Sequence, residues 1–579
     1  MDRKPVRQTT LLISFLYATL QAWVSADFPS NVYSLQLGDK CSVRWSYDWK
    51  NKWIKFEINT ELEPLEWFAF GFSDRGTFVS ADYCLFHPNS NGGRSLKDIW
   101  VNGQCYVEID SQQDCRDFSY EERGNNATFV FTRDFDTCDK KDYVIEEGTT
   151  HLVWATGTKN LLLKDSKLCD LVDGRTSRTT LLRVTIEPNF PGDSLMFEVT
   201  APNIVIPDTD TTYWCFVTQL PKVIQNVKHH LISFEAIIQN GNEKMVHHME
   251  LFHCERLLKW TSYSGPCTKK PKGVEVCKKV LAAWAMGASP FHYPDVTGLP
   301  VGGKGTSSFV MLEIHYDNPN LKGGVSDSSG LKVIMTPSLR KYDAGVIELG
   351  LEYIDKMAIP PLQKEFPLTG HCIAECTSAA LPFSGIWIFA SQLHTHLTGV
   401  KVETVLVRNG VEITRVDADN HFSPHYQEIR LLRKRVYVFP GNALYTKCTY
   451  NTMSRTEMTL GGFAISQEMC VNYIYYYPRV ELEVCKSSIS DYPLKEYFNA
   501  LHEFEDQQTG ATLPISTSYK RIKWNKLRVM VLDQLYKQSS IYMQCNKSNG
   551  ERFPGLWYQM PITKINQPLP PKKECSNLE

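Results

Sequence analysis

Histidine, methionine and cysteine side chains are unevenly distributed along this 579-residue chain, and their spacing suggests metal chemistry. Of the 15 histidines, only His87 and His151 precede residue 200. The first notable group is the pair His247 and His248 in Met-Val-His-His-Met-Glu, followed by His315 in Leu-Glu-Ile-His-Tyr. Imidazole suits copper, zinc and iron, and three imidazoles without an obvious carboxylate ligand make copper a good candidate.

The neighbouring pair needs an unusual backbone to bind one ion. Adjacent residues on a regular strand point to opposite faces, so His247 and His248 can share an ion only if the strand bends or bulges there. An isolated His-His pair is more often structural, and we assign that role to His229 and His230. Spacing alone leaves both interpretations open for His247 and His248.

The second group is His394 and His396 in Gln-Leu-His-Thr-His. On a strand both imidazoles project from one face and could bind one ion, with a pair of surface histidines as the alternative. Met469 stands in Gln-Glu-Met-Cys, and a single methionine is normally core filler. The neighbouring Cys470 could be cross-linked and hold the thioether in place. A thioether with two imidazoles favours Cu(I) and tolerates Cu(II).

Strands must position most of these side chains. Residues 53–58, after the first position, and residues 183–187 alternate apolar and polar side chains. Short β-rich runs separated by Gly, Pro, Asn and Asp recur throughout the chain, which predicts β-sandwiches rather than βαβ units. Helical patterning is scarce, with residues 497–504 and 524–538 as the best candidates. The predicted class is all-β.

The N-terminus indicates the secretory pathway. A basic start, an apolar run over residues 11–24 and small residues at 24–26 predict a signal peptide over 1–26, with an uncleaved signal-anchor as the alternative. Seventeen cysteines favour an oxidising compartment. Asn126 and Asn546 stand in glycosylation sequons. The C-terminus lacks a hydrophobic tail, so we expect no membrane span in the mature, secreted or lumenal chain.

The numbers of basic and acidic residues indicate whether a nucleic-acid partner is expected. With 62 Lys and Arg against 64 Asp and Glu, nothing basic indicates a nucleic-acid partner.

Several separated motifs together resemble one family. His-His-Met-Glu, Leu-Glu-Ile-His-Tyr, Leu-His-Thr-His and Glu-Met-Cys-Val-Asn-Tyr, in this order, resemble the copper type II ascorbate-dependent monooxygenases, and within them the dopamine β-hydroxylase group. Further matching stretches lie at residues 212–215, 282–285, 419–425 and 448–452. The resemblance implies an N-terminal DOMON-type β-sandwich followed by two jelly-roll-like copper monooxygenase β-sandwich domains. The implied segments are a signal peptide (1–26), a DOMON domain (27–185), a linker (186–210), a first copper domain (211–335), a second copper domain (336–500) and a C-terminal segment docking back (501–579).

The resemblance also implies the ligands and the reaction. It places an electron-storing copper on His247, His248 and His315, and an oxygen-binding copper on His394, His396 and Met469. Tyr213 and His394 fall at positions with a catalytic role in the family. The implied reaction inserts one oxygen atom of O2 into a C–H bond and releases the other as water, with two electrons from ascorbate.

The substrate is implied less directly. Peptide-amidating relatives carry an arginine two residues before the His-x-His, whereas this chain has Gln392, which offers no charge-assisted bidentate pair. A small amine, phenethylamine-like or catecholamine-like, is therefore favoured over a C-terminal carboxylate. Tyr476 could form an aromatic wall of the substrate pocket or belong to the core. A hydroxylase of a non-amine substrate and a secreted copper-binding protein without turnover are the alternatives, and a homo-oligomer is possible.

The DOMON-like region has no methionine between Asp27 and Leu195, so haem ligation by a Met/His pair within it is excluded. A structural or regulatory sandwich is the preferred interpretation.

The family's disulfide pattern accounts for twelve of the cysteines. The implied pairs are Cys215–Cys267, Cys254–Cys277, Cys372–Cys485, Cys376–Cys545, Cys448–Cys470 and Cys138–Cys575. Five cysteines stay unassigned: Cys41, Cys84, Cys105, Cys115 and Cys169. At most four of these five can pair with one another, so one thiol is predicted to be free or intermolecular.

Overall fold

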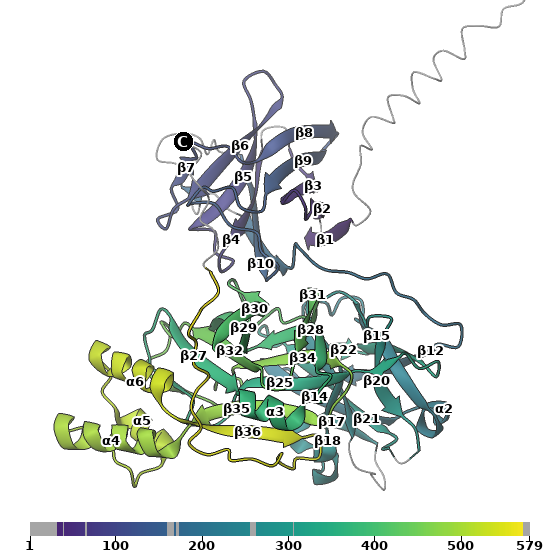
Figure 1. The fold of residues 1–579 in the computed structure, drawn as a ribbon. Helices are drawn as coiled ribbons and strands as arrows, with labels where there is room; N and C mark the ends of the chain where they lie inside the picture. The colour runs from purple at the N-terminus through teal and green to yellow at the C-terminus, as the bar shows by residue number, and fades with distance from the viewer. Residues whose placement is uncertain are drawn as a thin grey trace, which may run out of the picture. The chain divides into compact units, whose positions relative to one another are not determined.

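The computed structural model describes residues 32–38, 40–63, 66–158, 167–168, 173–254, 262–304 and 306–570. The expected signal peptide lies outside these residues. The chain forms two compact units, one of Met1–Glu146, Thr150–Leu182 and Cys575–Glu579, the other of Glu147–Thr149 and Arg183–Glu574. The fold is all-β, as predicted, with a few helices near the C-terminus (Figure 1). Among the described helices, none is both long and apolar enough to cross a membrane.

The first unit is a β-sandwich of two mainly antiparallel sheets. One sheet has the order β1 (Tyr33–Gly38), β2 (Cys41–Asp48), β3 (Trp53–Glu61), β9 (Asn126–Asp134) and β8 (Arg116–Arg123). The other has the order β11 (Asp173–Thr179), β10 (Thr150–Gly157), β4 (Trp67–Ser73), β5 (Ala81–Pro88), β6 (Arg94–Val101) and β7 (Val107–Ile109). The strand predicted over residues 53–58 is confirmed as β3. Its alternation turns Phe56 inward, where the ring lies 5.6 Å from that of Phe70 in β4.

In the first unit, the structure shows which of the described cysteines are disulfide-bonded and which is free. Cys84 and Cys115 form a disulfide, and Cys105 and Cys138 are also disulfide-bonded. Cys169 and Cys575, the expected partner of Cys138, lie outside the described residues. Cys41 is free and buried, and burial raises the pKa of its thiol to about 11. Cys41 is therefore the candidate for the thiol that was predicted to be free or intermolecular.

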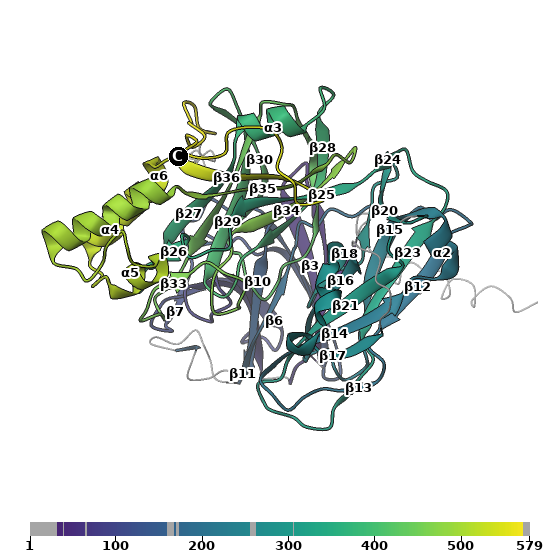
Figure 2. The same ribbon diagram turned by 90° about the horizontal axis from the view of Figure 1, so that it is seen from below.

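The second unit begins with a sandwich that carries the first histidine group. One sheet has the order β12 (Leu195–Thr200), β23 (Gly330–Thr336), β15 (Lys228–Ile237), β20 (Thr297–Gly302) and β24 (Tyr342–Asp343), with β19 (Phe291–His292) beside β15. The facing sheet has the order β17 (Tyr263–Pro266), β14 (Thr211–Gln219), β21 (Phe309–Asp317), β16 (Val246–Cys254) and β18 (Cys277–Ala285). Figure 2 shows these two layers together, and their inner faces share one apolar core. The short pair β13 (Ile204–Val205) and β22 (Ser326–Asp327) and the helix α2 (Lys222–Asn226) complete it.

Two sequence predictions near the start of this sandwich are wrong. Residues 195–200 of the expected linker form β12, which pairs along its whole length with β23. Residues 183–187, predicted as a strand, belong to no strand. The Arg183 side chain there bonds instead to Ser289 and to the hydroxyl of Tyr426, so side-chain contacts replace a backbone ladder.

A second sandwich carries the other histidine group. Its first sheet has the order β31 (Arg430–Val438), β28 (Ile386–His394), β34 (Val471–Tyr477), β25 (Gly345–Leu351), β35 (Leu482–Ile489) and β36 (Ile541–Lys547). Its second sheet has the order β27 (Phe366–Cys372), β32 (Ala443–Tyr450), β29 (Gly399–Arg408) and β30 (Val411–Asp419). The pair β26 (Ala358–Ile359) and β33 (Thr459–Leu460) and the helix α3 (Ala374–Ala380) lie outside these sheets. Buried aliphatic side chains of both sheets form its core.

The C-terminal segment docks on the second sandwich, because β36 hydrogen-bonds to β35. Before it come α4 (Asp491–Glu505), α5 (Ile515–Arg521) and α6 (Lys526–Gln538), grouped at one side of this sandwich in both views (Figures 1 and 2). Both predicted helices are confirmed, as the C-terminal half of α4 and as α6. The Asn525 side chain caps α6 by accepting a hydrogen bond from the Arg528 backbone N–H.

Five disulfides of the implied pattern are present in the second unit: Cys215–Cys267, Cys254–Cys277, Cys372–Cys485, Cys376–Cys545 and Cys448–Cys470. The two glycosylation candidates differ in access. Asn126 is exposed at the start of β9, whereas Asn546 is half-buried within β36. Glycosylation of either residue stays a prediction.

Candidate metal centres

The first histidine group meets on two adjacent strands. The pairing of β16 with β21 slips between Val246 and His248, so His247 is the extra residue of a bulge and His248 lies opposite His315. The backbone irregularity that the binding of one ion by this pair requires is therefore present. It turns the rings of His247 and His248 to the same place, with their Nδ1 atoms 3.1 Å apart.

These three imidazoles fit a metal ion. Nδ1 of His315 lies 3.3 Å from Nδ1 of His248, and ligand atoms of all three side chains lie within 4.8 Å of one another. Two nitrogen ligands each about 2 Å from one ion would be separated by roughly this much. An all-imidazole donor set suits copper.

The electrostatics of the group favour neutral rings. Burial and the neighbouring imidazoles hold the pKa of His248 well below its ordinary range, and the same causes lower the pKa of His315 to about 3. Neutral imidazole is the form that binds metals, so at neutral pH no proton competes for these nitrogens.

Tyr213 supports this group from the next strand. In β14 it lies opposite His315, and the two rings stack with centroids 4.4 Å apart and planes 3° from parallel. Burial and the nearby Glu313 and Glu250 carboxyls raise the pKa of Tyr213 to about 12. Its phenol is thus protonated at neutral pH, and its ring restricts the orientation of the His315 ring.

The second histidine group stands at a strand end. β28 ends at His394, and His396 follows two residues later outside the strand, so the two-residue strand period does not extend over both. The rings nevertheless lie 5.4 Å apart, almost perpendicular to each other. Nδ1 of His396 donates to the Gln467 carbonyl at 2.9 Å, which leaves Nε2 available as a ligand. Burial lowers the pKa of His394 to about 3.

Glu468 ties the backbone beside Met469 to the segment that carries His394 and His396. Its buried carboxylate accepts hydrogen bonds from the backbone N–H groups of His396 at 2.9 Å, Thr398 at 2.6 Å and Met469 at 3.2 Å. The backbone of Met469 is therefore tied to the His-x-His segment. The motif contained Glu468, but sequence alone gave no reason for this role, because the segments are about 70 residues apart.

Tyr450 and a disulfide fix the backbone beside Met469. The Tyr450 hydroxyl donates to the Met469 carbonyl at 2.7 Å. Cys470 joins Cys448 across a sequence separation of 22 residues. Both restraints act directly on the Met469 backbone or on its neighbour, so they limit where the thioether can lie.

We expect replacement of Cys470 and Cys448 together by serine to weaken copper binding at the second group. The disulfide contributes about 2–4 kcal/mol to stability, and its loss frees the residue next to Met469. Copper per chain, measured by atomic absorption after dialysis against a weak chelator, should fall from two ions towards one. Replacing Cys254 and Cys277 by serine removes a bridge of similar separation, 23 residues, and should leave the second copper in place. Unchanged copper content in the first variant would contradict the link between bridge and site.

His229 and His230 form a structural pair, as assigned from the sequence. Both side chains are fully buried in β15. Nε2 of His230 lies 2.8 Å from the Asp343 carboxylate, and its Nδ1 accepts from the Arg340 backbone N–H at 3.0 Å. The hydrogen bonds of His230 link β15 to Arg340 and Asp343, and neither ring belongs to the histidine groups described above.

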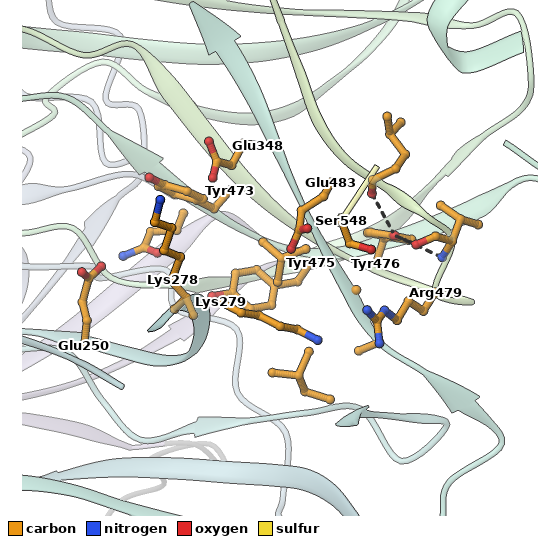
Figure 3. Close-up of a pocket in the computed structure, with 18 residues that line it drawn as sticks. Glu250, Lys278, Lys279, Glu348, Tyr473, Tyr475, Tyr476, Arg479, Glu483 and Ser548 are labelled. Atoms are coloured by element: carbon orange, nitrogen blue, oxygen red, sulfur yellow. Dashed lines mark hydrogen bonds between the residues drawn. The ribbon is translucent and has the colours of Figure 1, made fainter. Parts of the chain in front are cut away.

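A pocket lies beside β16, which carries His247 and His248, and β28, which ends at His394. Glu250, two residues after His248, and Gln392, two residues before His394, both line it. Figure 3 shows Glu250 and Tyr473 towards one side, Tyr475 and Tyr476 in the middle, and Arg479 towards the other.

The tyrosines of the pocket line its wall, and one of them also belongs to the core. The Tyr473 ring lies 6.2 Å from that of His394. Tyr476 lines the pocket, yet its hydroxyl donates to backbone carbonyls of Val480 and Leu482 and its ring is part of the second core. Both interpretations offered for Tyr476 therefore describe the same side chain.

Glu250 is the pocket residue that the sequence left without a role. It lies opposite Glu313 in the pairing of β16 with β21, and burial and the Glu313 charge raise its pKa to about 8. Among the described residues, the side chain of Glu250 makes no hydrogen bond or ion pair. The Glu250 carboxyl can accept a hydrogen bond from a cationic group, and the basic side chains of Lys278, Lys279 and Arg479 also line the pocket.

Comparison with known proteins agrees with this geometry. Residues 37–157 match the DOMON domain, residues 197–323 the N-terminal domain and residues 342–498 the C-terminal domain of the copper type II ascorbate-dependent monooxygenases. The match to the second domain covers the His-x-His segment and Met469, and the match to the first covers the other three histidines.

Three relatives match over most of their length. Human dopamine beta-hydroxylase is 41% identical, covering 98% of this chain and 92% of that protein. Tyramine beta-hydroxylase of Caenorhabditis briggsae is 38% identical, with coverages of 89% and 88%. Human DBH-like monooxygenase protein 1 is 32% identical, with coverages of 87% and 84%. The chain therefore belongs to the copper type II ascorbate-dependent monooxygenase family, whose cofactors are copper and ascorbate.

Proposed function

We propose that this monooxygenase hydroxylates a C–H bond of a small aromatic amine, with one copper held by His247, His248 and His315 and another by His394, His396 and Met469. The observation that carries the proposal is the pocket, which is lined by Glu250 of β16 and by Gln392 of β28. Copper bound at these residues supplies the single-electron and oxygen chemistry, with ascorbate as the reductant.

The chain's own residues prepare both sites. At the first, burial keeps the imidazoles neutral, and the Tyr213 ring holds that of His315. At the second, the Gln467 carbonyl fixes the tautomer of His396, and Glu468 aligns the Met469 backbone. We assign Tyr213 to positioning His315, and His394 to the oxygen side of the reaction.

The pocket supports an aromatic amine as substrate. Glu250 would accept hydrogen bonds from an ammonium group, and Tyr473 and Tyr475 offer ring faces to an aromatic body. Gln392 cannot clamp a carboxylate, and its Nε2 donates instead to the Gln427 carbonyl at 3.0 Å. Dopamine and tyramine, named in two of the relatives, are phenethylamines with both features.

The test is oxygen uptake by copper-loaded protein with ascorbate, using phenethylamines and glycine-extended peptides as substrates and mass spectrometry for products. We expect one added oxygen atom on an amine. Glu250→Gln should raise the KM for that amine by roughly 10- to 100-fold, because a hydrogen bond to a charged group contributes about 1.5–3 kcal/mol.

Glu483→Gln is the matched control, because Glu483 also lines the pocket but lies apart from Glu250 (Figure 3). It should leave the KM within a factor of about two, the size expected for a change away from the bound ammonium. An unchanged KM in Glu250→Gln would reject the amine assignment. Absence of any product with fully loaded protein would favour a copper-binding protein without turnover.

We infer that the chain acts in the secretory pathway or is secreted. Its second unit contains five disulfides, which persist in oxidising compartments. Homo-oligomer formation stays a prediction from the sequence.

A further inference from the structure

A loop of the second copper sandwich reaches the first histidine group. The segment between β30 and β31 contains His425, whose Nδ1 lies 3.3 Å from Nε2 of His247 in β16. The two rings are perpendicular, with centroids 5.6 Å apart. His247 and His425 are 178 residues apart in the sequence, and each belongs to a different sandwich.

The contact uses the nitrogen of His247 that faces away from the other ligands. Its Nδ1 lies beside Nδ1 of His248, at 3.1 Å, so Nε2 is the atom left for a partner outside the group. A metal-binding imidazole generally donates its second ring N–H to an acceptor, which fixes its orientation and raises its basicity. Nδ1 of His425 is in the position of that acceptor. By contrast, Nε2 of His315 is buried and has no hydrogen-bond partner.

The same loop is attached to the second histidine group. The Gln427 side chain donates to the Pro424 carbonyl at 2.6 Å and, more weakly, to the Thr395 carbonyl at 3.4 Å. The Gln427 carbonyl accepts from Gln392 at 3.0 Å. Thr395 stands between His394 and His396, so one short segment contacts both His247 and the backbone that carries the second histidine pair.

We propose that His425 is a positioning residue that accepts the Nε2–H of His247 and thereby couples copper binding at the first group to the packing of the two copper sandwiches. The inference rests on the proposed assignment of His247, His248 and His315 as copper ligands. Because coupling is reciprocal, copper at the first group also strengthens the attachment of the β30–β31 loop.

The test uses the full-length chain in a His396→Ala background, so that copper loads mainly at the first group. His425→Ala should weaken Cu(II) there by roughly 10- to 100-fold in competition with a chelator, the usual cost of losing such a partner. It should also change the Cu(II) electron paramagnetic resonance spectrum. His425→Asn, whose side-chain oxygen can accept the same hydrogen bond, should restore most of the affinity and the spectrum. His421→Ala, in the same loop, is the control and should bind copper as the background does.

Hydrogen exchange provides the second measurement. Copper loading should slow backbone amide exchange over residues 420–428 with His425 present and have little effect in His425→Ala. Unchanged affinity and spectrum in His425→Ala would overturn the proposal, and so would equal losses in the Ala and Asn variants, which indicate packing alone. If the background protein binds no copper at all, the ligand assignment itself fails, which is a distinguishable result.

Discussion

Replacing Met469 by isoleucine is expected to abolish ascorbate-dependent oxygen uptake while the chain stays folded. Isoleucine is apolar and of similar volume, so a buried methionine can be replaced for less than about 1.5 kcal/mol. It has no sulfur, and the second copper would keep only two imidazoles. Loss of a residue that hydrogen-bonds to a metal ligand lowers activity by up to roughly 100-fold. Loss of the ligand itself should cost more, so we expect turnover to fall by more than that factor. Oxygen-electrode traces with saturating ascorbate measure it.

The control for this variant is Met458→Ile. Met458 is partly buried against the same core cluster that contains Cys470, so its replacement tests the same change in packing. Turnover should stay within a factor of about two of wild type, as for a mild core change. Normal oxygen uptake by Met469→Ile would show that the thioether is not a required ligand.

Replacing His248 by alanine is expected to remove one of the two copper ions and all turnover. His248 lies at the centre of its group, because its Nδ1 is within 3.1 Å of that of His247 and within 3.3 Å of that of His315. Two remaining imidazoles should bind copper too weakly to survive dialysis. The protein should still bind copper at the second group, so metal analysis should give one ion per chain.

His253→Ala provides the control on the same strand. His253 is half-buried in β16 and its Nε2 lies 2.9 Å from the Ser307 carbonyl, so it loses a comparable hydrogen bond without touching the histidine group. It should keep two copper ions and its turnover. Two ions retained in His248→Ala would contradict the first ligand assignment.

Much of this molecule could be predicted from local patterns. Alternation of apolar residues predicted β3, and 3.6-residue periodicity predicted α6, because both patterns follow from strand and helix geometry. The strand predicted over residues 183–187 is wrong, although its residues also alternate. An alternating segment forms a strand only when a neighbour pairs with it, and there the Arg183 side chain is bonded to other loops instead. The opposite error concerns β12, whose pairing partner lies more than 100 residues away.

The sequence by itself determined the types of side chain at the two histidine groups, because residue type and spacing set which ligands a strand can present. It also indicated that His247 and His248 needed an irregular strand. Only the tertiary structure decided the contacts between residues far apart in the chain: Glu250 beside Glu313, Glu468 on the His-x-His segment and His425 on His247. These contacts depend on strand register and on how the two copper sandwiches pack, and no local pattern of residues predicts either.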